Sequence, residues 1–215
     1  MITDTSYDIP AEIMRYQRIA ICGAHGIGKT TLAEYLTRCV GRKCIPEIAR
    51  DLLQYKGKEY PDNTVEEAVN LQTAIFHSHM YLIRNEKEFV SDRSVFDHLA
   101  YIKSAIDRFS PELMMKLSTL FSNVAAIAVN ARAYYDLLIY YHPGSIELSE
   151  DQKVIDKMVY GYLERFYPGL MVTVKRDGGL VTCSEIGTVT IDESKPVITI
   201  SRLGEYSRNG NNSVF

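Results

Sequence analysis

The chain has 215 residues, which suits one globular domain with room for a small addition. Hydrophobic residues make up 46% and charged residues 24% of the sequence, the balance of an ordinary soluble domain whose core needs no disulfide support. The formal charge of -3 excludes the overall basic excess that marks many nucleic-acid-binding proteins, but it leaves room for a local basic strip.

Redox and targeting signals favour the reducing interior of a cell. The four cysteines include no pair at CxxC spacing, so free thiols are predicted in preference to disulfides or a metal site. The first residues are acidic at Asp4, Asp8 and Glu12 and contain no apolar run, so no secretory signal is predicted. No stretch reaches the roughly 20 apolar residues that a membrane span requires. We therefore expect a cytoplasmic protein, or one in the host cytoplasm if the source is a virus.

The N-terminal part of the sequence alternates short apolar runs with helical patterns. Residues 1–17 read as a polar leader, and Arg18–Cys22 is an apolar run typical of a buried strand. After a glycine-rich turn, apolar residues recur at helical spacing over Lys29–Val40, with Gly41 as the stop. Lys43–Glu47 is predicted to be a second, short strand.

The middle of the sequence continues this alternation. Thr64, with Glu67 three residues later, forms a capping box that opens a long amphipathic helix. Phe89–Asp92 is predicted to be a third strand, followed by a helix over Phe96–Ile106. A further helix opens at Ser110-Pro111, where proline occupies the tolerated first position.

A fourth strand and a capped helix complete this pattern. Tyr135–Tyr141 is strongly apolar, and Ser149 with Gln152 caps a helix that runs to Phe166. Strands that alternate with helices predict an α/β fold with a parallel sheet and helices on both faces. The crossovers between such strands are right-handed.

The C-terminal part differs, because its strand-like segments follow one another without a helix between them. These segments are Leu170–Val174, Leu180–Cys183, Thr188–Ile191 and Val197–Ile200. They predict a β-meander or two hairpins, and thus a C-terminal antiparallel β extension. The expected organisation is a leader at 1–17, a core at 18–168, the β extension at 169–204 and a mobile tail at 205–215.

A glycine-rich segment between the first strand and the first helix carries the clearest chemical signal. Gly23–Thr30 matches GxxxxGK[ST] at every fixed position, in the strand–loop–helix context that this motif requires. Glycines let backbone N–H groups converge on phosphate oxygens, and the helix N-terminus favours the anion. Lys29 is expected to reach the β- and γ-phosphates of ATP, and the Thr30 hydroxyl to bind Mg²⁺. The predicted nucleotide-binding residues are Gly23, Ala24, His25, Gly26, Ile27, Gly28, Lys29, Thr30 and Thr31.

Asp92 and Arg93 form a second signal. A carboxylate at the carboxyl end of a strand beside the phosphate loop can hold Mg²⁺, directly or through water. The Arg93 guanidinium can pair with a phosphate or fix the acceptor. The alternative is that both residues only begin a turn before a capped helix. With the phosphate loop present, we interpret Lys29, Asp92 and Arg93 as catalytic, and Thr30 and Asp92 as metal ligands.

Missing motifs narrow the class of nucleotide-binding protein. The sequence contains no Asn-Lys-x-Asp segment for guanine and no Ser-Gly-Gly signature of ABC ATPases. The chain is also short for an AAA+ motor with its helical lid domain. A phosphate loop fixes nucleotide binding rather than function, so these absences matter. They favour a small kinase.

Three segments resemble known kinases: GAHGIGKTTLA at Gly23–Ala33, PEIARDLL at Pro46–Leu53 and DRSVFDHLAY at Asp92–Tyr101. With the strand and helix after Tyr135, the resemblance covers residues 18–167. The sequence resembles the P-loop nucleoside and nucleotide kinase group, including thymidylate kinase and deoxynucleoside kinase relatives. It resembles more closely the small AAA_28 ATPases related to the ribosylnicotinamide kinase domain of the NadR family. This resemblance implies a P-loop kinase-type fold that uses ATP and Mg²⁺.

The resemblance also implies substrate-binding residues. A Glu at the position of Glu47 often serves such kinases as base or substrate ligand, and Arg50 would share its helix face. The alternative for this pair is a surface ion pair at a helix start. Arg93 and Asp97 join the substrate-binding set, although Asp97 also fits a helix cap. Either Glu47 or Asp92 could be the catalytic base.

The sequence departs from these kinases in the lid. The segment at 144–156 contains no arginine, whereas kinases of this group place arginines there over the phosphates. The candidates for the missing cation are Lys153, Lys157, Arg132 and Arg93.

These features predict a kinase that uses ATP and Mg²⁺ to phosphorylate a hydroxyl of a nucleoside, nucleotide or related acceptor. One alternative is a thymidylate kinase-like viral DNA-modification kinase that phosphorylates a hydroxymethyl pyrimidine in DNA. In a DNA kinase the β extension could bind the DNA. In either kind of kinase it could instead form a homodimer contact. An alternative of a different class is a nucleotide-dependent switch or regulatory ATPase, whose only acceptor is water.

Overall fold

The computed structural model describes residues 13–56, 65–108, 111–143 and 146–167, together with strands at 171–175, 180–183, 187–192 and 197–201. Strands and helices alternate through its first part. These elements are η1 (Ile13–Arg15), β1 (Arg18–Cys22), α1 (Lys29–Val40), β2 (Lys43–Ile45), α2 (Ile48–Lys56), α3 (Val65–Asn85), β3 (Phe89–Asp92), α4 (Val95–Arg108), α5 (Pro111–Val129), η3 (Ala131–Ala133), β4 (Leu137–His142) and α6 (Glu150–Phe166). The predicted bounds of β1, α1 and β3 are confirmed.

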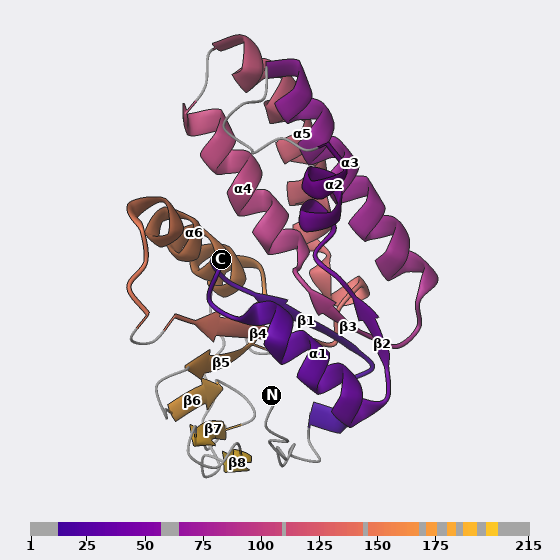
Figure 1. Ribbon diagram of the computed structural model, residues 1–215, viewed down its shortest axis with the longest axis vertical. Helices are drawn as coiled ribbons and strands as arrows, with labels where there is room; N and C mark the ends of the chain where they lie inside the picture. Colours follow the sequence, from indigo (N-terminus) through magenta and orange to yellow (C-terminus); the bar gives the residue numbers. More distant parts are fainter. Residues whose placement is uncertain are drawn as a thin grey trace, which may run out of the picture.

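A parallel sheet carries the fold, as predicted. The strands lie in the order β2-β3-β1-β4, and every neighbouring pair among them is parallel (Figure 1). In this register Ile21 pairs with Asp92 at the end of β3. Because parallel strands end at the same edge of a sheet, the loops after β1 and β3 are brought together there.

Helices cover both faces of the sheet, and the alternation of side chains along β1 shows how. Ile19 and Ile21 pack with residues of α1 in one buried cluster. Ala20 and Cys22 pack in a second cluster with residues of α3, α4, α5 and α6. Successive side chains of a strand point to opposite faces, so β1 contributes to both cores. In Figure 1, α3, α4 and α5 continue beyond the sheet as a helical lobe.

Local signals set the ends of the helices that border the phosphate loop. Gly28 is the N-cap of α1 and Gly41 its C-cap, with φ +66° and an N–H that donates to Thr37 O. At the start of α6, Ser149 and Gln152 form the predicted capping box. Helix α3 begins at Val65, and Thr64 of its predicted capping box lies outside the described residues, as does part of the predicted leader.

The C-terminal strands are described as backbone. They are β5 (Met171–Lys175), β6 (Leu180–Cys183), β7 (Gly187–Asp192) and β8 (Val197–Ser201). Strand β5 pairs in parallel with β4, so antiparallel pairing begins only at β6 and continues to β8. The predicted tail at 205–215 lies outside the described residues.

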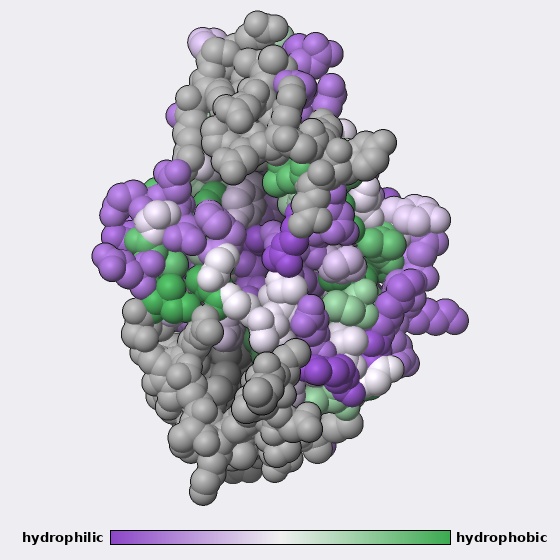
Figure 2. Space-filling view, in the orientation of Figure 1, coloured by the Kyte–Doolittle hydropathy of each residue, from purple (hydrophilic) through white to green (hydrophobic). Residues whose placement is uncertain are grey.

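The described surface offers no broad apolar region on the face shown in Figure 2. Hydrophilic residues predominate there, and apolar residues form small separate groups. Within the described ranges, no helix is both long and apolar enough to cross a membrane.

Candidate active site

The loop after β1 passes so close to neighbouring backbone that its first position requires glycine. Gly23 has φ +137°, and a Cβ there would lie 2.8 Å from Tyr141 O and 3.0 Å from Ile27 Cδ1. Gly26 and Gly28 also have positive φ, at 78° and 103°. L side chains are strained in this region of backbone conformation. The result is a tight glycine loop at a helix N-terminus, an arrangement that binds anions.

Lys29, at the start of α1, is buried beneath this loop. Its side chain turns back to donate to Gly23 O at 2.9 Å and to Ala24 O. Burial, reinforced by the positive charge of Arg93, lowers the pKa of Lys29 to about 8. A phosphate placed in the loop would favour the charged form of this amine.

Thr30 and Asp92, the two predicted metal ligands, are in direct contact. Thr30 Oγ1 donates to Asp92 Oδ2 at 2.6 Å. The other carboxylate oxygen, Asp92 Oδ1, is buried and has no hydrogen-bond partner among the described residues. Burial raises the pKa of Asp92. An unpartnered buried oxygen is costly, and oxygen ligands of this kind suit Mg²⁺, so the pair fits a magnesium ion beside a nucleotide.

Arg93 is fixed by the groups around it. Its Nε donates to Glu47 Oε1 at 3.0 Å, its Nη1 lies 3.4 Å from Asp97 Oδ1, and its guanidinium lies 5.4 Å from the centre of the Tyr101 ring. Burial alone would lower the pKa of Arg93, but Tyr101, Asp97 and Glu47 raise it above its ordinary value. Its φ of 138° is positive, unlike that of any other non-glycine residue described. Such strain persists only where the surroundings hold it, and it recurs at functional sites.

Glu47, just before α2, connects Arg93 to Arg50. Its Oε2 accepts from Arg50 Nη2 at 3.0 Å, so the predicted ion pair exists. Arg50 Nη2 also lies 3.2 Å from Thr30 Oγ1. Burial alone would raise the pKa of Glu47, but the charge and hydrogen bonds of Arg93 lower it below its ordinary value. Glu47 is therefore an ionised member of a network that reaches the phosphate loop.

Asp97 both caps the start of α4 and contacts the phosphate loop. Its Oδ2 accepts from the backbone N–H and the hydroxyl of Ser94, both at 2.9 Å, as a helix cap would. Its Oδ1 accepts from Gly23 N at 3.2 Å. Asp97 therefore ties the start of α4 to the phosphate loop.

Helix α6 holds the loop from another side. Asp156 Oδ1 accepts from Ala24 N at 3.3 Å, and its Oδ2 accepts from the Tyr140 hydroxyl at 2.7 Å. Gln152 Nε2 donates to His25 O at 2.9 Å. The loop is thus fixed by side chains from α4 and α6, which the sequence alone did not reveal.

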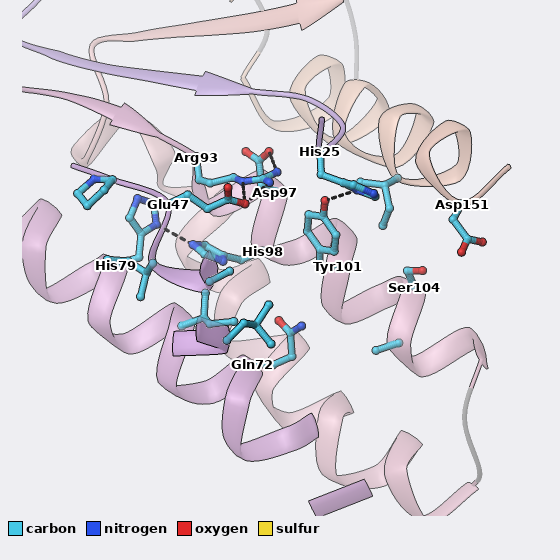
Figure 3. Close-up of a pocket in the computed structure, with 17 residues that line it drawn as sticks. His25, Glu47, Gln72, His79, Arg93, Asp97, His98, Tyr101, Ser104 and Asp151 are labelled. Atoms are coloured by element: carbon cyan, nitrogen blue, oxygen red, sulfur yellow. Dashed lines mark hydrogen bonds and ion pairs between the residues drawn. The ribbon is translucent and has the colours of Figure 1, made fainter. Parts of the chain in front are cut away.

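A cavity of about 750 Å³ opens beside this network (Figure 3). Glu47, Arg93 and Asp97 line it near the strands, whereas Gln72 and Ser104 lie further along the helices. The rest of its lining is His25, Pro46, Ile48, Ala49, Leu53, Ile75, His79, His98, Tyr101, Ala105, Asp151 and Ile155. A pocket of this size, with a mostly apolar surface and polar side chains placed around it, is typical of a site for a small molecule.

Sequence reasoning missed several polar residues of this cavity, among them His79, His98 and Ser104. Tyr101 also reaches the phosphate loop, because its hydroxyl and His25 Nδ1 are hydrogen-bonded at 2.9 Å. A signal was present, because Asp97, Tyr101 and Ser104 recur at helical spacing and so share one face of α4. The histidines give no such signal, because a buried histidine in a helix is commonly a core residue.

Two of the candidates for the missing lid cation already have partners in the structure. Lys153 pairs with Glu150 at 2.7 Å. Arg132 lies 5.6 Å from the centre of the Tyr167 ring. Arg93 Nη1 does reach the loop, at 3.4 Å from Gly23 O, but it is fully committed to its acidic neighbours.

Comparisons with known proteins agree with this geometry. The AAA domain family model AAA_28 matches residues 18–153, more than half of the chain. No curated protein matches the chain.

Several solved structures share the fold. NadR protein in complex with NR aligns with a TM-score of 0.59 at 17% identity, over 77% of this chain and 45% of that chain. NadR protein in complex with NAD and AMP-PNP aligns with a TM-score of 0.56 at 18% identity, over 78% of this chain and 46% of that chain. Deoxyadenosine kinase from M. mycoides, with the products dCMP and dCDP, gives 0.53 at 14% identity, over 73% and 88%. The chain thus spans less than half the length of the NadR structures that it matches.

The parallel sheet and the glycine loop above Lys29 define a P-loop domain with a kinase-like fold. The chain belongs to the AAA_28 family of AAA domains.

Proposed function

We propose that this protein is a kinase that uses ATP and Mg²⁺ to phosphorylate a hydroxyl group of a small acceptor, such as a nucleoside or a nucleotide. The observation that carries the proposal is the contact of Glu47 and Arg93 with both the cavity and the phosphate-loop network. A switch ATPase needs a site for water, but it has no use for a cavity of about 750 Å³ beside the phosphates. With ATP as donor and three described cysteines free, the enzyme would act in the cytoplasm.

The phosphate-binding part consists of the loop, Lys29, Thr30 and Asp92. The loop N–H groups and Lys29 would bind the phosphates and hold them in line with the acceptor. Mg²⁺, when held by the Thr30 hydroxyl and Asp92, would neutralise charge on the β- and γ-phosphates. The hydrogen bond between Thr30 and Asp92 keeps both oxygens on the same side of the loop.

The two candidate bases occupy different places, which supports different roles. Glu47 lines the cavity, whereas Asp92 contacts Thr30 and is not part of the cavity lining. Arg93 lowers the pKa of Glu47, which keeps this carboxylate ionised and able to accept a hydrogen bond from an acceptor hydroxyl in the cavity. We therefore assign Glu47 to orienting the acceptor hydroxyl and accepting its proton, and Asp92 to the metal.

The size of the cavity and the fold relatives support a nucleoside-sized acceptor. One relative was solved with NR and another with dCMP. A pocket of about 750 Å³ can enclose a molecule of that size. A hydroxymethyl pyrimidine in DNA would have to leave the base stack to enter such a pocket, which costs a few kcal/mol.

The test is a transfer screen with γ-labelled ATP and Mg²⁺. The acceptors are nucleosides, nucleoside monophosphates, nicotinamide riboside, and DNA with and without hydroxymethyl pyrimidines. Label on a free nucleoside or nucleotide is the expected result, and Lys29→Ala should abolish it. If only DNA were labelled, the acceptor would be the polymer and not a small molecule. Phosphate release with no labelled acceptor would contradict the kinase and support the switch ATPase.

A further inference from the structure

A chain of three hydrogen-bonding residues borders the cavity, and the proposed transfer does not use it. Ser91 Oγ, from β3, lies 2.8 Å from His79 Nε2, and His79 Nδ1 lies 2.6 Å from His98 Nε2. The exposed fractions are 0% for Ser91, 1% for His79 and 6% for His98. Figure 3 shows the two histidines, from α3 and α4, facing each other at the cavity.

Only one direction of donation pairs the side-chain hydrogens of both Ser91 and His79. If His79 Nε2–H donated to Ser91, the serine hydroxyl hydrogen would find no acceptor among the described residues. An unpaired buried donor is costly. If Ser91 donates to His79 instead, His79 Nδ1–H donates to His98 Nε2, and each of these buried hydrogens is paired.

This direction places the hydrogen of His98 on Nδ1. His98 Nδ1 has no partner among the described residues, and it is not one of the fully enclosed atoms that lack one. His98 lines the cavity, and Nδ1 is the ring nitrogen that His79 leaves available to it. The cavity therefore contains a neutral N–H donor whose direction is set from the sheet.

Both imidazole rings are uncharged at neutral pH. Burial lowers the pKa of His98 to about 3, and the charge of Arg93 acts in the same direction. Burial and the neighbouring His98 lower the pKa of His79 well below its ordinary value. A neutral N–H among apolar walls such as Ile75 and Ala105 suits an uncharged hydrogen-bond acceptor rather than an anion.

We propose that His98 Nδ1–H recognises the acceptor molecule by donating to a carbonyl oxygen or ring nitrogen on its uncharged, planar part. His79 and Ser91 are positioning residues that keep the hydrogen on Nδ1. This inference rests on the proposed function, because it takes the cavity to be the acceptor pocket. It also predicts specificity: a molecule that places a hydrogen-bond donor or a C–H group opposite His98 Nδ1–H should bind more weakly.

The direction of the chain is tested by NMR on protein with ¹⁵N-labelled histidine, assigned with His79→Asn and His98→Asn. Two-bond proton–nitrogen correlations distinguish the tautomers of a neutral ring. Both His79 and His98 should carry hydrogen on Nδ1. Hydrogen on Nε2 of either ring would overturn the inference. Ser91→Ala should give a mixture of tautomers, Ser91→Thr should restore the single tautomer, and Ser122→Ala on the surface of α5 should change nothing.

Recognition is tested by titrating thymidine, cytidine and nicotinamide riboside, each of which carries a carbonyl oxygen. At least one should shift the His98 Nδ1 resonance. His98→Leu should weaken its binding about tenfold, which is the loss of one hydrogen bond. His98→Asn, whose amide can replace Nδ1–H, should recover most of it, and AMP-PNP affinity should stay unchanged in both variants.

Two outcomes would overturn the inference: no shift with any of the three compounds, or equal affinity in wild type and His98→Leu. The readout is binding rather than turnover, so it separates this inference from the proposed function. A protein that binds one compound through His98 but transfers no phosphate would contradict the kinase and leave the recognition role intact.

Discussion

At the scale of single residues, Lys29 combines deep burial with a proposed phosphate-binding role that requires a positive charge. Its pKa of about 8 applies without nucleotide, and bound phosphates should raise it. AMP-PNP affinity should therefore be highest below pH 8, where Lys29 is already protonated, and fall by up to about tenfold per pH unit above it. Calorimetry at pH 8.5 in buffers of different ionisation enthalpy should show proton uptake. Uptake that persists in Lys29→Arg would assign the proton to another group.

The roles of Asp92 and Glu47 should be distinguishable by how the activity of their variants depends on Mg²⁺ concentration. Asp92→Asn should lower kcat about 100-fold and raise the Mg²⁺ concentration needed for half-maximal rate, with little effect on nucleotide binding without metal. Glu47→Gln should lower kcat without moving the Mg²⁺ dependence, because Glu47 lines the proposed acceptor cavity. Asp107→Asn, in an exposed ion pair with Lys103, is the matched control. An altered Mg²⁺ dependence in Glu47→Gln would exchange the two roles.

At the scale of elements, alanine substitutions at three glycines test why the first position of the phosphate loop must be glycine. Gly23 lies in the loop, Gly41 ends α1 and Gly161 lies within α6. Gly23→Ala would bring a Cβ against the backbone of Tyr141 at positive φ, so it should cost about 3 kcal/mol or more and abolish nucleotide binding. Gly41→Ala shares only the positive φ and should cost about 1 kcal/mol. Gly161→Ala, within α6 and with open space around it, should stabilise by about 0.5–1 kcal/mol. Urea unfolding of the three variants measures this order. Equal losses at Gly23 and Gly41 would show that the close contact is unimportant.

Elements with local signals at both ends could be predicted from the sequence. Helix α1 lies between the glycine loop and Gly41, and the capping box at Ser149 marks the start of α6. Strand β4 was placed too early by two residues, because Tyr135 reads as a strand residue. In the structure Tyr135 is buried before the strand, where its hydroxyl accepts from Val95 N and its carbonyl accepts from Tyr167. That tertiary packing outweighs local β propensity.

At the scale of the whole molecule, the site divides into a part that the sequence shows and a part that only folding creates. The phosphate loop is contiguous, and Asp92 follows a strand, so both could be predicted. The proposed acceptor cavity is assembled from α2, α3, α4 and α6, which are far apart in the chain. Ser91, His79 and His98 lie on three different elements, and no spacing in the sequence relates them.

The lid segment contains no arginine, so the cation that neutralises the transferred phosphate must come from elsewhere or from a lysine. Helices α2 and α6, near the phosphate loop, each carry a candidate. Arg93 is tied to Glu47 and Asp97, and Lys153 pairs with Glu150 at the start of α6. Arg50 of α2 also pairs with Glu47, at 3.0 Å, but its side chain is 52% exposed and its guanidinium already lies 3.2 Å from Thr30 Oγ1. It can therefore move onto a transferred phosphate while Glu47 keeps its ion pair with Arg93.

Arg50→Ala should accordingly lower kcat about 100-fold while AMP-PNP affinity changes little, because the cation acts mainly on charge that develops during transfer. Arg50→Lys should recover part of the rate, since a point charge replaces the fork of the guanidinium. Arg84→Ala, which removes an arginine over the Tyr134 ring away from the loop, is the matched control. Steady-state kinetics with the acceptor found in the transfer screen decide the outcome. A larger loss in Lys153→Ala than in Arg50→Ala would return the cation to α6, and would mean that this helix closes over the phosphates during turnover.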